Sequence, residues 1–150
     1  MPQTISPASS LYIADLGAIP HDVGQFFSEE AQFCIDDAEG IWTAEATISR
    51  LDDIWGPRVS KLVLARIGAR PDGVPEYAGE LLIDSGTLAI AADDDPGCHF
   101  DQALAALRSA SPARVGDTII CSTGLGDGAY PVFIDYEGSR PAMITLQFLE

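Results

Sequence analysis

A glycine-rich loop is the first place in this chain where chemistry could occur. Gly124, Gly126 and Gly128 alternate with other residues, and Asp127 is the one carboxylate among them. Glycine at this density lets the backbone take positive φ and leaves its N–H groups uncovered. We therefore take this loop, with Tyr130 just after it, as a candidate ligand-binding segment. An ordinary tight turn is the alternative, since the Asp127-Gly128 pair is typical of hairpins.

The residues that follow the loop exclude the usual phosphate-binding chemistry. The run 130–134 has the pattern of another strand, so no helix N-terminus is present to meet a phosphate. No Gly-Lys-Ser/Thr sequence follows either, which excludes a Walker-type loop. Any ligand of this loop must be recognised in another way.

A second polar turn, Asp84-Ser85-Gly86, follows the apolar run 81–83. If the two turns meet at one end of the fold, Asp84 and Asp127 form a carboxylate pair, to which Asp135 could add a third group. Paired carboxylates suit general acid–base catalysis or a hard cation. A metal-assisted hydrolase or cation-binding protein is therefore one hypothesis. The alternative is that each aspartate caps N–H groups of its own turn.

The acidic run 93–95 and the neighbouring Cys98-His99 lack the spacing of a metal site. An EF-hand loop alternates its acids and closes with a glutamate. Adjacent Cys and His chelate one zinc ion poorly, and His21 is the only other histidine. We expect a solvated acidic loop whose negative charge stabilises the N-terminus of the helix after it through the helix dipole. Because no nucleophile elbow or triad context is present, we predict neither catalytic residues nor a cofactor.

The cysteines and the N-terminus indicate a reducing compartment. Cys34, Cys98 and Cys121 are odd in number and contain no CxxC pair, so we expect reduced and mostly buried thiols. Residues 1–10 lack the basic and apolar regions of a secretory signal, which favours a cytoplasmic protein. At 150 residues and 47% hydrophobic, the chain fits a single domain over 1–150, with no apolar run of membrane-spanning length.

The charge balance directs the functional hypothesis. There are 23 acidic and 8 basic residues, for a net charge of −15. Such a field disfavours nucleic acid and anionic membranes, which need Lys and Arg contacts. Our leading hypothesis is a non-catalytic bacterial binding module for a basic protein partner, such as an immunity-type protein that neutralises a basic nuclease toxin. A homodimer through an exposed sheet edge is a further prediction, and acidity that serves solubility alone is the plain alternative.

The elements that must position these residues are mainly strands. Alternation predicts a strand over 41–48, with Trp42, Ala44, Ala46 and Ile48 on one face, and branched apolar residues predict another over 59–67. Two hairpins are expected: 81–83 pairs with 88–90, and 132–136 pairs with 143–149. Two further strands are predicted over 11–16 and 32–36, where the strand pattern is weaker. Helical spacing predicts one helix over 101–110. The fold class is therefore an antiparallel β-sandwich or flattened barrel with one helix.

The two polar turns also carry a family resemblance. The strings LIDSGTLAI (82–90) and STGLGDGAYPV (122–132) resemble a bacterial β-rich domain family of unknown function with an Asp-Ser-Gly and a Gly-Asp-Gly-x-Tyr-Pro motif. The resemblance covers about the second half of the chain. It implies a β-rich fold in which the two turns are structurally related, and it implies no mechanism.

Overall fold

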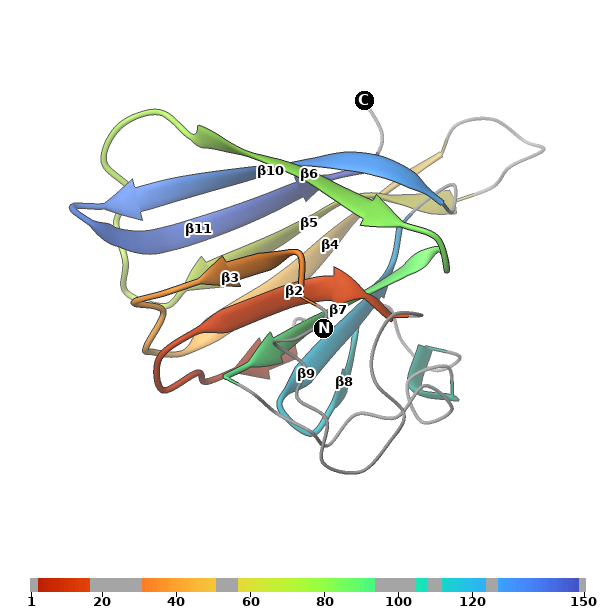
Figure 1. The fold of residues 1–150 in the computed structure, drawn as a ribbon, viewed down its shortest axis with the longest axis horizontal. Helices are drawn as coiled ribbons and strands as arrows, with labels where there is room; N and C mark the ends of the chain where they lie inside the picture. The colour runs from red at the N-terminus through yellow and green to blue at the C-terminus, as the bar shows by residue number, and fades with distance from the viewer. Residues whose placement is uncertain are drawn as a thin grey trace.

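The computed structural model describes residues 3–16, 31–50, 57–93, 105–107, 112–123 and 127–148. Two antiparallel sheets pack face to face (Figure 1), which confirms the predicted β-sandwich. No helix in the described part of the chain has the length and apolar character needed to span a bilayer. The strands are β1 Gln3–Ile5, β2 Leu11–Asp15, β3 Phe33–Ile35, β4 Trp42–Arg50, β5 Pro57–Arg66, β6 Glu76–Ile83, β7 Thr87–Ala92, β8 Ala113–Val115, β9 Thr118–Ser122, β10 Gly128–Glu137 and β11 Arg140–Gln147.

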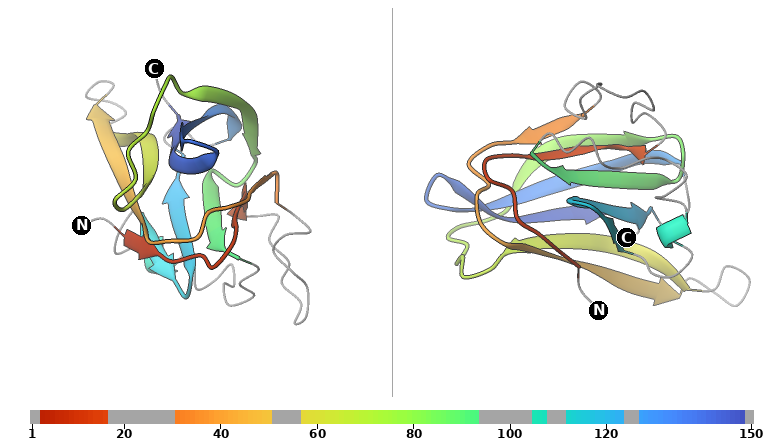
Figure 2. Two further views of the ribbon diagram at one scale, coloured as in Figure 1. Left: turned by 90° about the vertical axis from the view of Figure 1, so that its left-hand side faces the viewer. Right: turned by 90° about the horizontal axis from the view of Figure 1, so that it is seen from below.

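The strand order mixes the two halves of the chain. One sheet has six strands in the order β1-β4-β5-β11-β10-β6, and the other has five in the order β3-β2-β7-β9-β8. The two views of Figure 2 show these layers from the end and from below. Because β6 and β7 belong to different sheets, as do β9 and β10, the chain crosses between the layers at both of the polar turns.

The core lies between the sheets, and alternating residues of the long strands build much of it. In β11, Ile144 and Leu146 point inward and are fully buried, and Phe148 beyond the strand end is also buried. Phe148 meets Tyr130 of β10 edge to face, with ring centroids 5.3 Å apart. Each large buried side chain contributes roughly 1.5–3 kcal/mol, so this interface holds the layers together.

The first long strand follows its prediction except at one end. Trp42 and Ala44 of β4 are buried, and the Trp42 indole Nε1 donates a 2.8 Å hydrogen bond to the Ala38 carbonyl. Ile48, predicted on the same face, is 53% exposed. The β4–β5 register shifts between Thr47 and Ile48, and such a bulge turns the following side chains to the other face.

One predicted hairpin is confirmed and the other is wrong. β10 and β11 pair directly around the 138–139 turn, as expected. β6 and β7 do not pair: β6 bonds to β10, and β7 lies between β2 and β9. The turn 84–86 is thus a crossing between sheets. Of the helix predicted over 101–110, residues 105–107 are helical, and the rest lies outside the described residues.

The two sheets approach each other along the β6 side. The Gln32 side-chain amide bonds both backbone groups of Leu82, at 2.7 Å to its N–H and 2.7 Å to its carbonyl, while the Gln32 backbone N–H bonds Ile13 of β2. Nearby, Phe33 packs over Gly79, where an added Cβ would lie 3.5 Å from the ring. Gly79 has φ +130, a conformation that glycine adopts readily.

Candidate functional site

The two polar turns singled out by the sequence lie side by side at one end of the sandwich. Gly128 of β10 pairs with Ile83 of β6, and Thr87 of β7 pairs with Ser122 of β9. The 84–86 connection therefore lies next to Thr123 and Asp127, the residues on either side of 124–126. Gly124 and Gly126, two of the candidate ligand residues, lie outside the described residues.

A buried aspartate that the sequence analysis missed organises the first crossing. Asp15, at the end of β2, is only 7% exposed. Its carboxylate accepts hydrogen bonds from the backbone N–H of Asp84 at 3.1 Å, from the N–H of Ser85 at 3.3 Å, and from the Ser85 hydroxyl. Charge-assisted bonds of this kind are about twice as strong as neutral ones. Ser85 is therefore held as part of the turn.

The second crossing is tied to the first by Thr123. This fully buried residue donates from its N–H and from its Oγ1 to the Gly86 carbonyl, both at 3.1 Å. Gly86 has φ +74, the left-handed region that glycine adopts at low cost. Asp15, the 84–86 turn and Thr123 form one continuous hydrogen-bonded unit across three strands.

Asp84 and Asp127 are neighbours by register. Each lies one residue beyond the last paired positions, Ile83 and Gly128, and both residues are exposed. Tyr130, by contrast, is 8% exposed and belongs to the core; its hydroxyl donates to the Asp127 carbonyl at 3.3 Å. The ring passes close under Gly128, where an added Cβ would lie 3.2 Å from the Tyr130 Oη. The exposed groups at this end are thus the Asp84 and Asp127 carboxylates. Tyr130 lies in the core and bonds the Asp127 backbone.

Asp135 cannot join that pair. It lies on the same strand as Gly128, eight residues after Asp127, which places it about 26 Å away along β10. The idea of Asp135 as a third carboxylate beside Asp84 and Asp127 is therefore wrong. Within the described residues, no group of three or more His, Cys, Asp or Glu side chains is placed to hold a metal ion.

The acidic run 93–95 is described only at Asp93, which does not behave as a solvated loop residue. Its carboxylate accepts from the backbone N–H groups of Ala8, Ser9 and Ser10, at 2.7, 2.8 and 3.1 Å. Partial burial raises the pKa of the Asp93 carboxyl, but the three N–H donors outweigh that effect and hold the pKa below its ordinary value. Residues 94–99, with Cys98 and His99, lie outside the described residues, as does His21.

The described cysteines differ in exposure. Cys121 of β9 is buried, as predicted, whereas Cys34 of β3 is exposed, so the expectation of buried thiols is wrong for that residue. The Cys34 thiol lies 3.5 Å from the Asp36 carboxylate and donates to it. Partial burial and this carboxylate raise the pKa of the thiol, which keeps it protonated and unreactive near neutral pH.

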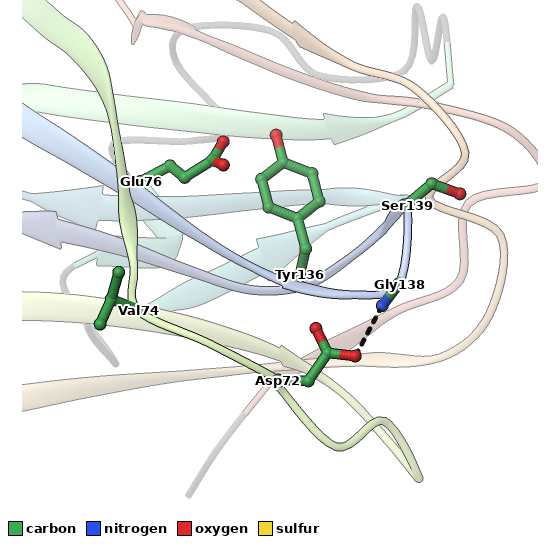
Figure 3. Close-up of a pocket in the computed structure, with 6 residues that line it drawn as sticks. All are labelled: Asp72, Val74, Glu76, Tyr136, Gly138 and Ser139. Carbon is green, nitrogen blue, oxygen red and sulfur yellow. Dashed lines mark hydrogen bonds between the residues drawn. The ribbon is translucent and has the colours of Figure 1, made fainter.

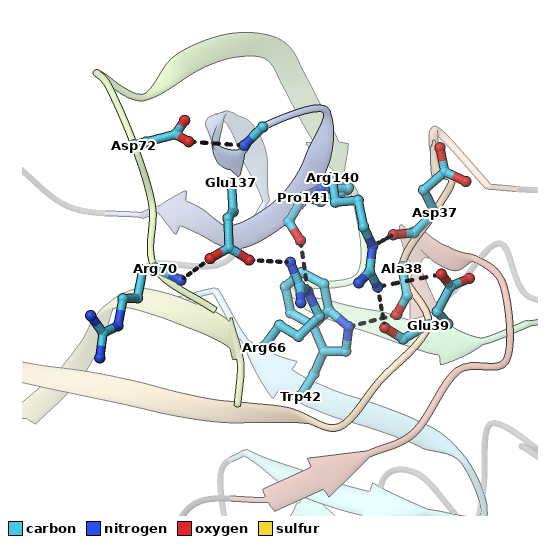
Figure 4. A network of polar contacts seen from close by, with 11 residues as sticks. Asp37, Ala38, Glu39, Trp42, Arg66, Arg70, Asp72, Glu137, Arg140 and Pro141 are labelled. Atoms are coloured by element: carbon cyan, nitrogen blue, oxygen red, sulfur yellow. Dashed lines mark hydrogen bonds and ion pairs between the residues drawn. The ribbon is translucent and has the colours of Figure 1, made fainter. Parts of the chain in front are cut away.

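The opposite end of the sandwich carries Arg66, Arg70 and Arg140 in a structural network (Figure 4). Arg66, with its side chain 10% exposed, bonds the Pro141 carbonyl at 3.1 Å and pairs with Glu137 at 3.4 Å. Arg140 bonds the Glu39 carbonyl at 2.6 Å and pairs with its carboxylate at 3.6 Å. These contacts tie the β10–β11 turn to the loops before β4 and after β5.

A shallow hollow of about 310 Å³ opens beside this network, between the 70–75 segment and the β10–β11 turn (Figure 3). Tyr136 and Glu76 both line it, and in this view the Glu76 carboxylate points toward the Tyr136 ring. The Asp72 carboxylate is already used, because it accepts a 3.0 Å bond from the Gly138 N–H. This bond holds the 70–75 segment against the β10–β11 turn, and the hollow lies between the two.

The sequence analysis missed one further surface, the outer face of the six-stranded sheet. The register aligns Val63, Thr145, Phe133 and Tyr77 in a row across β5, β11, β10 and β6, which we call the outer-face stripe. Glu45 of β4 ends the row beside Val63. Strand alternation indicated which residues of each strand face outward, but the row itself depends on the pairing of β11 with β5 and of β10 with β6. No local signal predicts those pairings.

Comparison with known proteins adds no family to this description. No family model matches the chain, and no curated protein and no solved structure shows significant similarity to it. The resemblance of its second half to a bacterial β-rich domain family stays a prediction.

Proposed function

We propose that this chain is a non-catalytic binding module that docks a basic protein partner, acting in the bacterial cytoplasm in the manner of an immunity-type protein. The observation that carries the proposal is that arginines are paired within the chain while the chain as a whole is strongly acidic. Arg66, Arg114 and Arg140 are each paired with a carboxylate of the same chain, while the net charge of the chain is −15. Three of the eight basic residues are thus paired within the chain, which leaves fewer cations to offset the exposed carboxylates.

The exposed carboxylates support this reading because they lie on rigid strands and strand ends. Glu45 of β4, Glu80 of β6, and Asp84 and Asp127 at the β6 and β10 ends are all exposed. Fixed negative charges of this kind raise the association rate with a basic partner and select against acidic ones.

The test is capture from a bacterial lysate at 50, 150 and 400 mM salt, with an unrelated folded protein of similar net charge immobilised as control. We expect a discrete basic protein that remains bound to this chain at 150 mM salt, at one-to-one stoichiometry, and is absent from the control. A broad set of basic proteins shared with the control, all released at the same salt concentration, would refute specific docking and leave solubility as the role of the charge.

A second candidate function is cation binding, including metal-assisted hydrolysis, at Asp84 and Asp127. The register supports it, because these exposed residues extend the β6–β10 ladder as direct neighbours. Carboxylate oxygens are the ligands that Ca²⁺ and Mg²⁺ prefer. A cation that binds only the folded chain raises its melting temperature by mass action.

The measurement is a thermal melt with Ca²⁺, Mg²⁺, Mn²⁺ or Zn²⁺ for the wild type and for Asp127→Asn. If the site exists, one cation raises the melting temperature by about 4 °C or more, equivalent to at least about 1–2 kcal/mol for a chain of this length, and the variant loses that increase. Asp135→Asn is the matched control, because it removes the same charge from the far end of β10. Equal shifts in all three proteins would rule the site out.

A further inference from the structure

The outer face of the six-stranded sheet has an apolar centre. The outer-face stripe, Val63, Thr145, Phe133 and Tyr77, crosses four adjacent strands in register. The rings of Tyr77 and Phe133 lie 5.8 Å apart and are tilted by 57°, and Tyr77 is 59% exposed. An exposed Tyr77 ring beside the partly exposed Phe133 is a costly feature for a surface that faces only water.

That centre is hollowed. A cavity of about 380 Å³ opens on this face, lined by Pro75, Phe133 and Thr145. Its walls are mostly apolar, unlike those of the hollow beside Tyr136. The centres of protein interfaces are built from such pockets, each of which receives an apolar or aromatic side chain of the partner.

Charged residues surround the centre on the same face. Glu45 ends the stripe at β4, Asp135 lies one row away on β10, and Glu80 of β6 pairs with Pro131. Lys61 of β5, beside Gln147, is the one lysine of the chain. An apolar centre with a charged rim is the anatomy of a protein interface, and here the rim is mainly acidic.

We propose that the outer-face stripe is the docking surface for a basic protein partner. The cavity at Phe133 receives an apolar side chain, and Glu45, Glu80 and Asp135 face lysine or arginine side chains at the margin. This proposal rests on the proposed function and assigns it a place on the molecule. A second copy of the chain does not fit, because the same acidic margin and a net charge of −15 would face each other.

Two synthetic peptides of equal length and charge probe this surface, one alternating leucine with lysine and the other alternating serine with lysine. Binding is followed by titration of the ¹⁵N-labelled protein by NMR. We expect the leucine peptide to bind about tenfold tighter, with the largest shifts at the amides of Val63, Phe133 and Thr145. Shifts spread evenly over the acidic surface, and equal for the two peptides, would overturn the proposal.

Variants separate the stripe from general charge. Thr145→Lys places a cation in the cavity wall, and we expect it to weaken the leucine peptide about tenfold or more while the melting temperature stays near the wild-type value. The double variant Asp84→Asn with Asp127→Asn removes two charges at the sandwich end and should leave the affinity within about twofold. Similar losses in both variants would show that charge alone drives binding.

The same variants distinguish failure of the surface from failure of the function. A lysate partner that binds Thr145→Lys as well as wild type would overturn this surface and leave the proposed function standing. Failure to recover any specific basic partner would overturn both. Sedimentation that reveals a dimer, lost in Thr145→Lys, would assign the stripe to a second copy instead.

Discussion

The two outer faces of the sandwich are built from the same kind of alternating strand but meet different surroundings. On the outer side of the five-stranded sheet, the small Ala14, Ala89 and Ala91 are fully buried together with the larger Leu16 and Ile120. Leu107 of the helical segment packs against them. On the six-stranded sheet the outward residues are larger, and in the described part of the chain no element packs over Phe133 or Thr145. The three alanines allow a close approach of the covering segment on one face, whereas on the other face the aromatic pair lies beside an open hollow.

The largest expected effect comes from removing the centre of the covered face. Ile120→Ala should lower the free energy of unfolding by about 2–4 kcal/mol, because it leaves a cavity that packed neighbours cannot fill. Phe133→Ala on the other face should cost about 1 kcal/mol or less despite its larger side chain, because that ring is partly exposed. Urea denaturation measures both. Equal losses would mean that the two faces are equally packed.

A matched pair of alanines tests the same contrast by adding volume. Ala89→Leu should destabilise the fold by about 1–3 kcal/mol, since Ala89 is fully buried under its cover. Ala65→Leu, on the outward side of β5 between Thr43 and Met143, should change stability by about 0.5 kcal/mol or less. A tolerated leucine at position 89 would contradict the close packing assigned to that face.

The smallest expected effect comes from the Asp93 carboxylate, which bonds the β1–β2 connection next to the five-stranded sheet. The folded-state pKa of Asp93 lies below its ordinary value of 3.8, so the unfolded chain binds this proton more readily. Stability from this group is therefore complete above about pH 5 and is lost as pH falls through the lowered folded-state pKa. Asp93→Asn keeps a residue that tolerates the φ of +53 and removes the charge.

We expect this variant to be less stable than wild type by on the order of 1 kcal/mol at pH 7. The difference should shrink toward zero as the pH falls through the lowered folded-state pKa of Asp93. Thermal melts of the two proteins from pH 7 to pH 2.5 check this. A difference that stays constant over the whole range would contradict the assigned role of the Asp93 charge.

The regular strands could be predicted from the sequence because alternation reports directly which residues are buried. β4 and β11 follow from that pattern, β5 follows from its branched apolar residues, and β10 and β11 form the expected hairpin. The 81–90 segment failed because Asp84-Ser85-Gly86 supplies the same turn chemistry to a hairpin and to a crossing between sheets. One signal was present: the run 88–92 is apolar without alternation, which is typical of a strand covered on both faces.

The candidate site could be predicted only in part, for a related reason. Asp84 and Asp127 stand out by their glycine neighbours, and the register places them together. Asp15 and Asp93 do not stand out, because the N–H groups they bind lie 69 to 85 residues away in sequence. A carboxylate that caps a distant turn looks, in the sequence alone, like any surface aspartate.

The surroundings of β7 have a consequence for the order of folding. This strand is buried on both faces and bonded on both sides, to β2 and to β9. Asp15 holds the turn before it, and Asp93 after it holds the segment that enters β2. None of these contacts is local, so β7 cannot be stabilised until chain segments far apart in sequence have met. We expect its amides to exchange with solvent only in global unfolding, and folding of the whole chain to wait for this one short strand.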